Sequence, residues 1–427
     1  MKVLVVSQRF WPENEKINDI CREMVARGLR VDVLTGQPNF PRGRFFKGYK
    51  AMGNRLQHKW GIRIFRTFEL ALEDGTGYQR VGNYFSFAIG AAIRSLFLAR
   101  NKYDAVLIWQ TSPVMQIETG LRVARRLKVP AVTVAVDLWP HAFVDEMELK
   151  SPMLKKIFAS VSQRNYLESD LLIATSSRMY TYFKTTLKVL ESRLKLVNLC
   201  PDSAFLTPVT DPVIMERYNG SFNIVWAGQF WKKQDFDTLY ETGLLMLSAG
   251  LKTIRLVMVG KSKELSELRA RCHSAHLEDI FYFEEVTAQK DYAKYYHIAD
   301  AFLGVRQGDL SDEYAPGLET INYMAAGKPI LMMSGGNERK LVKDGKCGFT
   351  CDNGDARGLF NMIKRVYTCT RADREKMGQA ALDYVAEYLN PEDCVSEIIA
   401  SLSRDGQDEI IINDSSIFKL EDDTDNF

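Results

Sequence analysis

The sequence predicts two α/β domains, each built on a parallel sheet of the Rossmann type, that face each other across a cleft. Three observations support this fold class. Predicted strands and helices alternate along the chain, and the strand segments are continuous apolar runs, as in strands buried on both faces. The alternation is interrupted once, by a segment rich in Pro and Asp at 200–212, and then begins again.

The first series of elements begins with an apolar run at 2–7, which predicts a buried strand. A loop with Pro12 follows, and apolar spacing over 17–27 predicts a helix that ends before Gly28. Further strands are expected at 31–35, 105–109, 131–136, 171–174 and 194–197, and further helices at 114–127, 152–169 and 177–187.

The second series repeats this pattern after the interruption. Its strands are expected at 223–226, 255–260, 280–283, 301–305 and 329–333, and its helices at 235–249, 262–275, 288–298, 317–326, 336–343 and 355–368. We therefore place one domain at 1–205 and a second at 206–385, with a terminal helix at 386–404 that packs back on the first domain and an acidic tail at 405–427.

Composition and motifs exclude several classes of protein. Lys and Arg number 56 against 54 Asp and Glu, so the net charge of +2 does not favour nucleic acid as a partner. The seven scattered cysteines suit reduced thiols and a cytoplasmic location, and no signal peptide or transmembrane span is expected. The sequence also lacks the motifs of serine hydrolases, P-loop NTPases, zincins and dinucleotide enzymes.

Ligands of open α/β sheets bind beyond the carboxyl ends of the strands, so polar residues just after strands are the candidates for a site. In the second half, Gly228 and Gly260 would let a ligand approach the backbone, and Gln229 follows Gly228. Lys232 and Lys233 lie at a helix start, where ammonium groups and backbone amides suit a diphosphate. A lysine pair in a loop can equally be a solvated one.

Residues 313–329 are the most informative segment. Gly317 and Leu318 open a helix, so their amides could hold phosphate oxygens. Glu319 and Asn322 lie three positions apart, on one helix face, and could reach ribose hydroxyls, although Glu319 could also be an ordinary acid of a helix start.

In the first half, Asp137 and His141 follow the strand at 131–136 and face the same cleft. Either could act as acid, base or polar clamp, and His141 could also be a simple loop histidine. The apolar segment 81–100 predicts either a helix packed on the sheet or one that touches an anionic membrane.

Eight segments, in one order, resemble the GT-B glycosyltransferases of the large retaining family four, in the branch that builds bacterial surface polysaccharides. The similarity runs from residue 1 to about residue 400, and the segments lie at 1–13, 33–50, 134–140, 169–177, 224–239, 256–269, 317–331 and 335–349.

The resemblance implies roles for individual residues. Lys232 falls on the family's phosphate-binding lysine, and Gly317 with Leu318 falls on its phosphate-binding amides. The family's two glutamates, for donor sugar and ribose, fall on Tyr314 and Asn322, with Glu313 and Glu319 close by. Replacing Asn322 by glutamate is then expected to keep or improve nucleotide affinity.

The chain departs from the family's pattern at two further places. Gln229 replaces a frequent arginine, and Asn14, Glu15 and Lys16 stand where the family usually has two glycines.

The implied function is transfer of a hexose from a nucleotide sugar, most simply a UDP-sugar, to a hydroxyl of a lipid-linked saccharide. Retention of configuration and independence of metal or cofactor come with the resemblance, and Asp137 would orient or deprotonate the acceptor. Partners are then the donor, the acceptor and an anionic membrane at the inner face of the plasma membrane. Two alternatives stay open: a GT-B-type nucleotide-sugar epimerase or phosphorylase, and a non-catalytic binding subunit.

Overall fold

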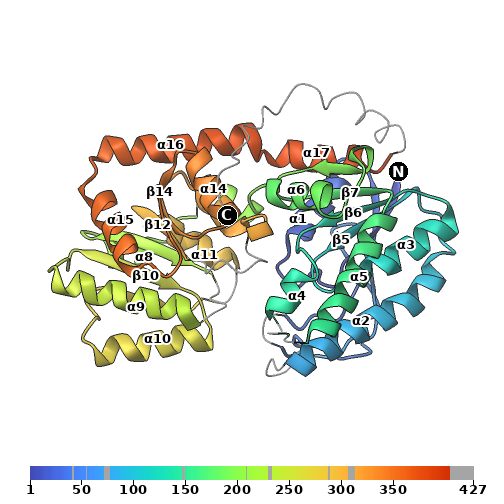
Figure 1. Cartoon of the computed structure of the whole chain (residues 1–427), viewed down its shortest axis with the longest axis horizontal. Helices are drawn as coiled ribbons and strands as arrows, with labels where there is room; N and C mark the ends of the chain where they lie inside the picture. The colour runs from blue at the N-terminus through green and yellow to red at the C-terminus, as the bar shows by residue number, and fades with distance from the viewer. Residues whose placement is uncertain are drawn as a thin grey trace.

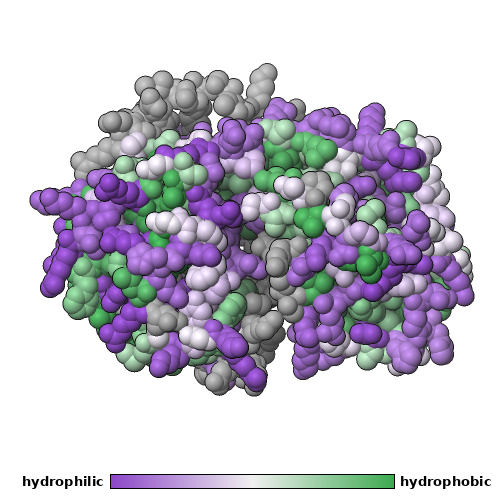
Figure 2. Space-filling model, turned by 180° about the vertical axis from the view of Figure 1, so that it is seen from behind, coloured by the Kyte–Doolittle hydropathy of each residue, from purple (hydrophilic) through white to green (hydrophobic). Residues whose placement is uncertain are grey.

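The structure is a computed structural model of the chain. It describes residues 1–40, 43–53, 55–71, 77–146, 149, 151–207, 209–228, 233–286, 289–305 and 313–403. Figure 1 shows two domains side by side, with the helices α16 (Arg371–Tyr388) and α17 (Pro391–Ala400) running in succession across both. Figure 2 shows the opposite side of the molecule, where hydrophilic and hydrophobic residues are interspersed on both domains. The predicted arrangement of two parallel-sheet α/β domains is confirmed.

The first domain is built on an eight-stranded sheet of order β3-β4-β2-β1-β5-β6-β7-β8. Pairing is parallel except between β3 and β4. The strands are β1 (Lys2–Val6), β2 (Arg30–Thr35), β3 (Leu56–Lys59), β4 (Ile62–Arg66), β5 (Ala105–Gln110), β6 (Ala131–Ala135), β7 (Leu171–Ala174) and β8 (Leu194–Leu196).

Helices cover both faces of this sheet because its strands are apolar on both faces. Leu4 and Val6 pack in the cluster that α2, α3, α5 and α6 cover, whereas Val3 and Val5 pack in the cluster that α1 and α17 cover. The helices are α1 (Lys16–Ala26), α2 (Gly77–Leu98), α3 (Gln116–Leu127), α4 (His141–Glu146), α5 (Pro152–Glu168) and α6 (Ser177–Thr185).

The second domain is built on a six-stranded, wholly parallel sheet of order β11-β10-β9-β12-β13-β14. Its strands are β9 (Phe222–Ala227), β10 (Ile254–Val259), β11 (Phe281–Glu284), β12 (Ala301–Val305), β13 (Ile330–Met333) and β14 (Gly348–Cys351). Its helices are α8 (Pro212–Tyr218), α9 (Lys233–Ser248), α10 (Lys263–Ser274), α11 (Gln289–Tyr296), α13 (Leu318–Ala325), α14 (Asn337–Asp344) and α15 (Ala356–Thr368).

The chain crosses between the domains twice. The first crossing is the segment around 197–211, which contains the short helix α7 (Ser203–Leu206). The second lies between α16 (Arg371–Tyr388), which packs on α13, and α17 (Pro391–Ala400), which packs on α1. Val395 and Ile398 of α17 are buried in the core of the first domain and fix the helix to it, and Arg27 adds a hydrogen bond to the Ser396 hydroxyl at 2.7 Å.

Three strands, β3, β4 and β14, were not among those expected from the sequence. The β3–β4 hairpin was not predicted; its turn is Trp60-Gly61, and both residues have positive φ, as a two-residue hairpin turn requires. The segment at 81–98 of α2 is long and apolar enough, by length and composition alone, to cross a membrane, and 44% of it is buried here. A single such helix is weak evidence for a span, because core helices pass the same test.

Candidate functional site

The boundary between the domains brings together residues that sequence analysis singled out separately. Tyr314, just before α13, lies against His141 of α4, with ring centroids 5.7 Å apart, and against Tyr182 of α6 at 5.4 Å. The Ser176 hydroxyl donates to the Tyr314 carbonyl at 2.7 Å. Glu313 forms an ion pair with Arg178 at 3.6 Å. Tyr314, Glu313 and His141 therefore join the two domains in this structure.

On the second domain, Gly228, Gly260 and Glu319 lie together at the carboxyl edge of the sheet. A Cβ on Gly228 would come within about 3.0 Å of the Glu319 carboxylate, and one on Gly260 would lie 2.6 Å from the Gly228 carbonyl oxygen. Glu319 accepts a hydrogen bond from the Tyr323 hydroxyl at 2.9 Å. Glycine is required at Gly260 because the close atom belongs to the backbone, whereas a side chain at Gly228 would require the Glu319 carboxylate to shift by a few tenths of an ångström.

The first turn of α13 presents backbone amides at this same edge. Gly317 precedes the helix with φ of 73°, a left-handed conformation that glycine adopts without strain. Backbone amides in the first turn of a helix point out of its start, which is the arrangement that binds phosphate oxygens, and Leu318 is the first residue of α13. The Leu318 side chain packs against the core of the first domain.

Asn322 forms its side-chain hydrogen bonds with Asp202, in the segment that connects the two domains. Its carbonyl oxygen accepts from the Asp202 backbone amide at 2.8 Å, and its amide donates to the Asp202 carboxylate at 3.1 Å. Asp202 also forms an ion pair with buried Lys16 at 3.5 Å. We call these three residues the interdomain latch, because Lys16 belongs to α1, Asp202 to the first crossing and Asn322 to α13.

On the first domain, Asp137 follows β6 and is held by the loop after β5. Its carboxylate accepts from the Ser112 backbone amide at 3.0 Å and from the Ser112 hydroxyl at 3.4 Å. The Trp139 indole donates in turn to the Ser112 hydroxyl at 2.9 Å. These contacts tie the β5 and β6 loops together at the edge that faces the second domain.

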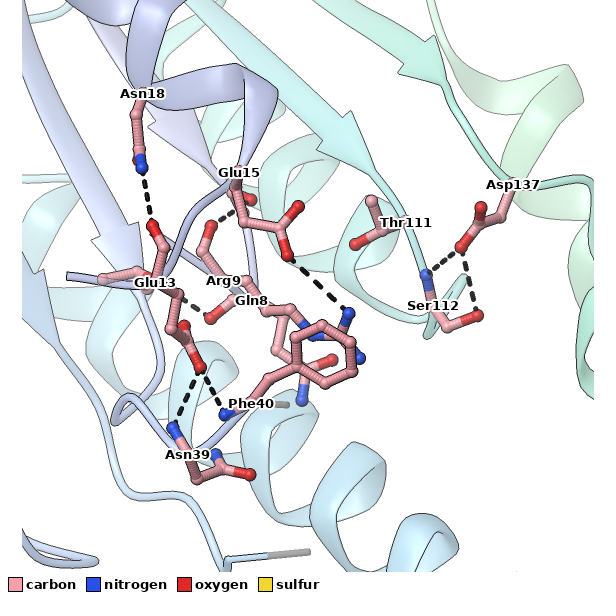
Figure 3. Close-up of polar contacts among 12 residues, drawn as sticks. Gln8, Arg9, Glu13, Glu15, Asn18, Asn39, Phe40, Thr111, Ser112 and Asp137 are labelled. Carbon is pink, nitrogen blue, oxygen red and sulfur yellow. Dashed lines mark hydrogen bonds and ion pairs between the residues drawn. The ribbon is translucent and has the colours of Figure 1, made fainter. Parts of the chain in front are cut away.

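Arg9, in the loop after β1, and Glu15, one of the residues that stand where the resemblance expects glycines, lie on the other side of Thr111 from Asp137 (Figure 3). Arg9 forms an ion pair with Glu15 at 3.7 Å, and its guanidinium stacks 3.5 Å from the Phe40 ring centroid. Burial raises the pKa of Glu15 to about 7, although Arg9 opposes this. The rule that polar residues after strands form sites applies equally to the β1 loop and could have found this pair.

The remaining candidate residues, Gln229, Lys232 and Lys233, lie in the loop before α9 and at the start of that helix. Gln229 and Lys232 lie outside the described residues, and Lys233 begins α9 with a side chain outside them. Within the residues that the structure describes, no group of three or more His, Cys, Asp or Glu side chains could hold a metal ion.

The sequence and the structure were compared with protein families and with known proteins. Residues 215–383 match the family model "Glycosyl transferases group 1", whereas no curated protein matches the chain significantly. Sucrose-phosphate synthase from Thermosynechococcus elongatus superposes with a TM-score of 0.70 and 16% identity, covering 93% of this chain and 97% of that one.

Two further solved structures are similar. The Anabaena protein HepE, in complex with UDP and glucose, has a TM-score of 0.65 and 16% identity, covering 95% of this chain and 100% of that one. WaaG, a glycosyltransferase involved in lipopolysaccharide biosynthesis, has a TM-score of 0.65 and 14% identity, with coverages of 92% and 98%. The two-domain architecture is therefore the GT-B fold, as predicted.

Proposed function

We propose that this chain is a glycosyltransferase that moves a hexose from a UDP-linked sugar to a hydroxyl of a lipid-linked saccharide, in the synthesis of a cell-surface polysaccharide. The observation that carries the proposal is the grouping of Gly228, Gly260 and Glu319 at the start of α13. The match of residues 215–383 to group 1 glycosyltransferases supports it. The anomeric configuration is retained in this proposal, as the resemblance to retaining family four implies.

In the proposed reaction, the diphosphate is the group that must be stabilised. Negative charge collects on it as the anomeric C–O bond breaks, and preorganised donors stabilise that charge without reorganisation of water. The amides of Leu318 and Glu319 supply such donors, with Lys232 as the proposed ammonium group. No metal or cofactor is needed in this scheme. Glu319, at the carboxyl edge beside Gly228, would accept from a ribose hydroxyl.

Asp137 would act on the acceptor side by holding the β5 and β6 loops in place. Its carboxylate already accepts from Ser112, so we assign it orientation of the acceptor loops rather than proton transfer. His141 and Tyr314 would close the sugar site where the domains meet.

Calorimetry with UDP tests the proposal. The Glu319→Gln variant should bind UDP about 1–2 kcal/mol more weakly, the scale of a lost hydrogen bond to a charged group. Glu267→Gln on α10, an exposed carboxylate paired with Lys263, is the matched control and should bind like the parent. Absence of any UDP affinity in the parent chain would instead favour the binding-subunit alternative. Conversion of a UDP-sugar to another sugar without acceptor would favour the epimerase.

A membrane-facing surface fits a lipid-linked acceptor. One face of α2 exposes Phe85, Ile89, Ile93, Leu96 and Phe97, between 44% and 59% accessible. The start of α5 adds further exposed apolar side chains, Met153, Leu154 and Ile157, beside exposed Lys155 and Lys156. Ring contacts from Tyr84 through Phe143 to Phe158 link the two helices.

We propose that this surface rests on the inner face of the plasma membrane, which places the protein on the cytoplasmic side. Basic residues next to an apolar helix face favour anionic lipid, and salt weakens that attraction. Sedimentation with anionic vesicles should fall with added salt, and Ile89→Glu should reduce it, whereas binding that is indifferent to lipid charge would contradict the proposal.

A further inference from the structure

We propose that Glu15 and Thr111 form the acceptor subsite, which binds the reacting hydroxyl of an uncharged sugar and receives its proton. This inference rests on the proposed function and names a substrate class for its acceptor side. It also assigns proton acceptance to Glu15 rather than to Asp137.

Thr111 is the first observation. It directly follows β5 and is 8% exposed, yet its hydroxyl has no hydrogen-bond partner among the described residues. A buried hydroxyl without a partner is costly unless a ligand or water supplies one. Figure 3 shows this hydroxyl turned towards the side on which Arg9 and Glu15 lie.

The position of Thr111 beside the β1 loop is fixed by Gln116. The Gln116 side chain accepts from the Gln8 backbone amide at 3.0 Å and donates to the Thr111 carbonyl at 2.8 Å. In the sheet, β5 lies between β1 and β6. Thr111 therefore stands between the loop that carries Glu15 and the loop that carries Asp137.

Glu15 is the second observation. It occupies the residue before α1, where a side chain commonly caps the helix, but it makes no such cap. Its carboxylate makes an ion pair with Arg9 and no hydrogen bond within the described part of the chain. Its hydrogen-bonding capacity thus remains open to a ligand at the carboxyl edge of the first sheet.

The charges around Glu15 determine whether this subsite suits a neutral or a charged ligand. The single guanidinium of Arg9 lies among three carboxyl groups, those of Glu13, Glu15 and Asp137. Arg9 is already paired with Glu15 and stacked on Phe40, so a second anion would meet net repulsion. A phosphorylated sugar is disfavoured, whereas a neutral hydroxyl can donate to Glu15 and accept from Thr111.

In the transfer step, the acceptor hydroxyl gives its proton to the Glu15 carboxylate. Its oxygen forms the bond to the anomeric carbon on the face from which the diphosphate departs, as the bond from that carbon to the diphosphate breaks, so the configuration is retained. The nucleoside diphosphate leaves with the electron pair. Burial raises the pKa of Glu15 to about 7, and the charged groups around it are Arg9, Glu13, Asp137 and Asp202. A carboxyl group titrating near neutral pH is suited to accept this proton.

The test measures UDP release from UDP-glucose with neutral methyl glycosides of glucose, galactose and mannose as acceptors, and with glucose 6-phosphate as the charged comparison. We expect at least one neutral glycoside to raise UDP release above that with water alone, and glucose 6-phosphate to raise it less. Glu15→Gln and Thr111→Val should each lose about 10- to 100-fold of the acceptor kcat/KM, the fold-change expected for a hydrogen bond to a charged group.

Further variants separate this role from a structural one. Thr111→Ser keeps the hydroxyl and should restore activity, and Glu23→Gln on α1, an exposed partner of Arg27, should match the parent. In the parent, acceptor kcat/KM should rise with pH through about 7, and Glu15→Gln should remove this ionisation.

Two results overturn the inference while leaving the proposed function intact. The first is that Glu15→Gln and Thr111→Val release UDP from UDP-glucose, in the presence of neutral glycosides, with the same acceptor kcat/KM as the parent. The other is a stronger response to glucose 6-phosphate than to any neutral glycoside. A parent chain that binds no UDP by calorimetry overturns the proposed function itself, and the inference with it.

Discussion

The interdomain latch makes a specific prediction for Asn322. Sequence resemblance alone favours Asn322→Glu as a neutral or improving change, but the structure places the Asn322 amide 3.1 Å from the Asp202 carboxylate. A glutamate there would lose the donated hydrogen bond and bring two carboxylates together. We therefore expect Asn322→Glu to destabilise the contact between the domains.

The size of the effect follows from the geometry. Losing a hydrogen bond to a charged group costs about 1.5–3 kcal/mol. Two unit charges about 4 Å apart repel by roughly 4 kcal/mol at an effective dielectric constant of 20, and side-chain rotation away from Asp202 relieves part of this. We expect a total near 3–5 kcal/mol, or roughly 10 °C in the melting temperature of a domain of this size.

The assay is thermal unfolding of the parent, of Asn322→Glu, and of the double variant Asn322→Glu with Asp202→Asn. The second substitution restores a donor opposite the new carboxylate, so it should recover part of the lost stability, and the double-mutant cycle isolates that coupling. If Asn322→Glu melts like the parent and binds UDP more tightly, the latch does not hold the domains, and Asn322 faces the nucleotide as the resemblance suggested.

Three further predictions concern the site and its support. Gly260→Ala should weaken UDP binding measured by calorimetry, because its Cβ would lie 2.6 Å from the Gly228 carbonyl oxygen and force the two loops apart; unchanged affinity would mean that these loops do not shape the site. Lys232→Ala should reduce turnover by about 3 kcal/mol in barrier, a few hundredfold, and Lys233→Ala by much less; equal, small losses would remove the pair from the mechanism. The melting temperature should fall as the pH rises from 5 to 8, since burial raises the pKa of Glu13 and Glu69 to about 7, so the folded state holds protons that the unfolded state has released. Glu69→Gln should flatten that dependence, and an unchanged slope would contradict the assignment.

The sequence predicted those elements whose signal is local. Strands such as β1 and β9 were found because both of their faces are buried and their residues are continuously apolar. The β3–β4 hairpin was missed because β3 has only four residues, none of them buried. Its Trp60-Gly61 turn is also not a common hairpin sequence.

Sequence analysis placed Gly228 just after a strand and Glu319 in the first turn of a helix, and the structure brings the two residues together, while their roles stay predictions. What could not be predicted was which partner each side chain takes. The Asn322 partner, Asp202, lies 120 residues away, and the neighbours of Tyr314 belong to the other domain. Such contacts depend on how the two domains meet, which periodicity and spacing do not encode.

The double crossing of the chain has a kinematic consequence. A single flexible connection would leave one domain free to twist and tilt in any direction relative to the other. Here α16 is fixed to the second domain, where Gly378 packs against the Gly327 carbonyl, and α17 is fixed to the first, so the joint at 389–390 is a second pivot beside the segment around 197–211. Two pivots define a line, and the remaining low-energy motion is rotation about that line. Rotation about that line would separate Tyr314 from His141, and the hydrogen bonds of the latch between Asn322 and Asp202 oppose it.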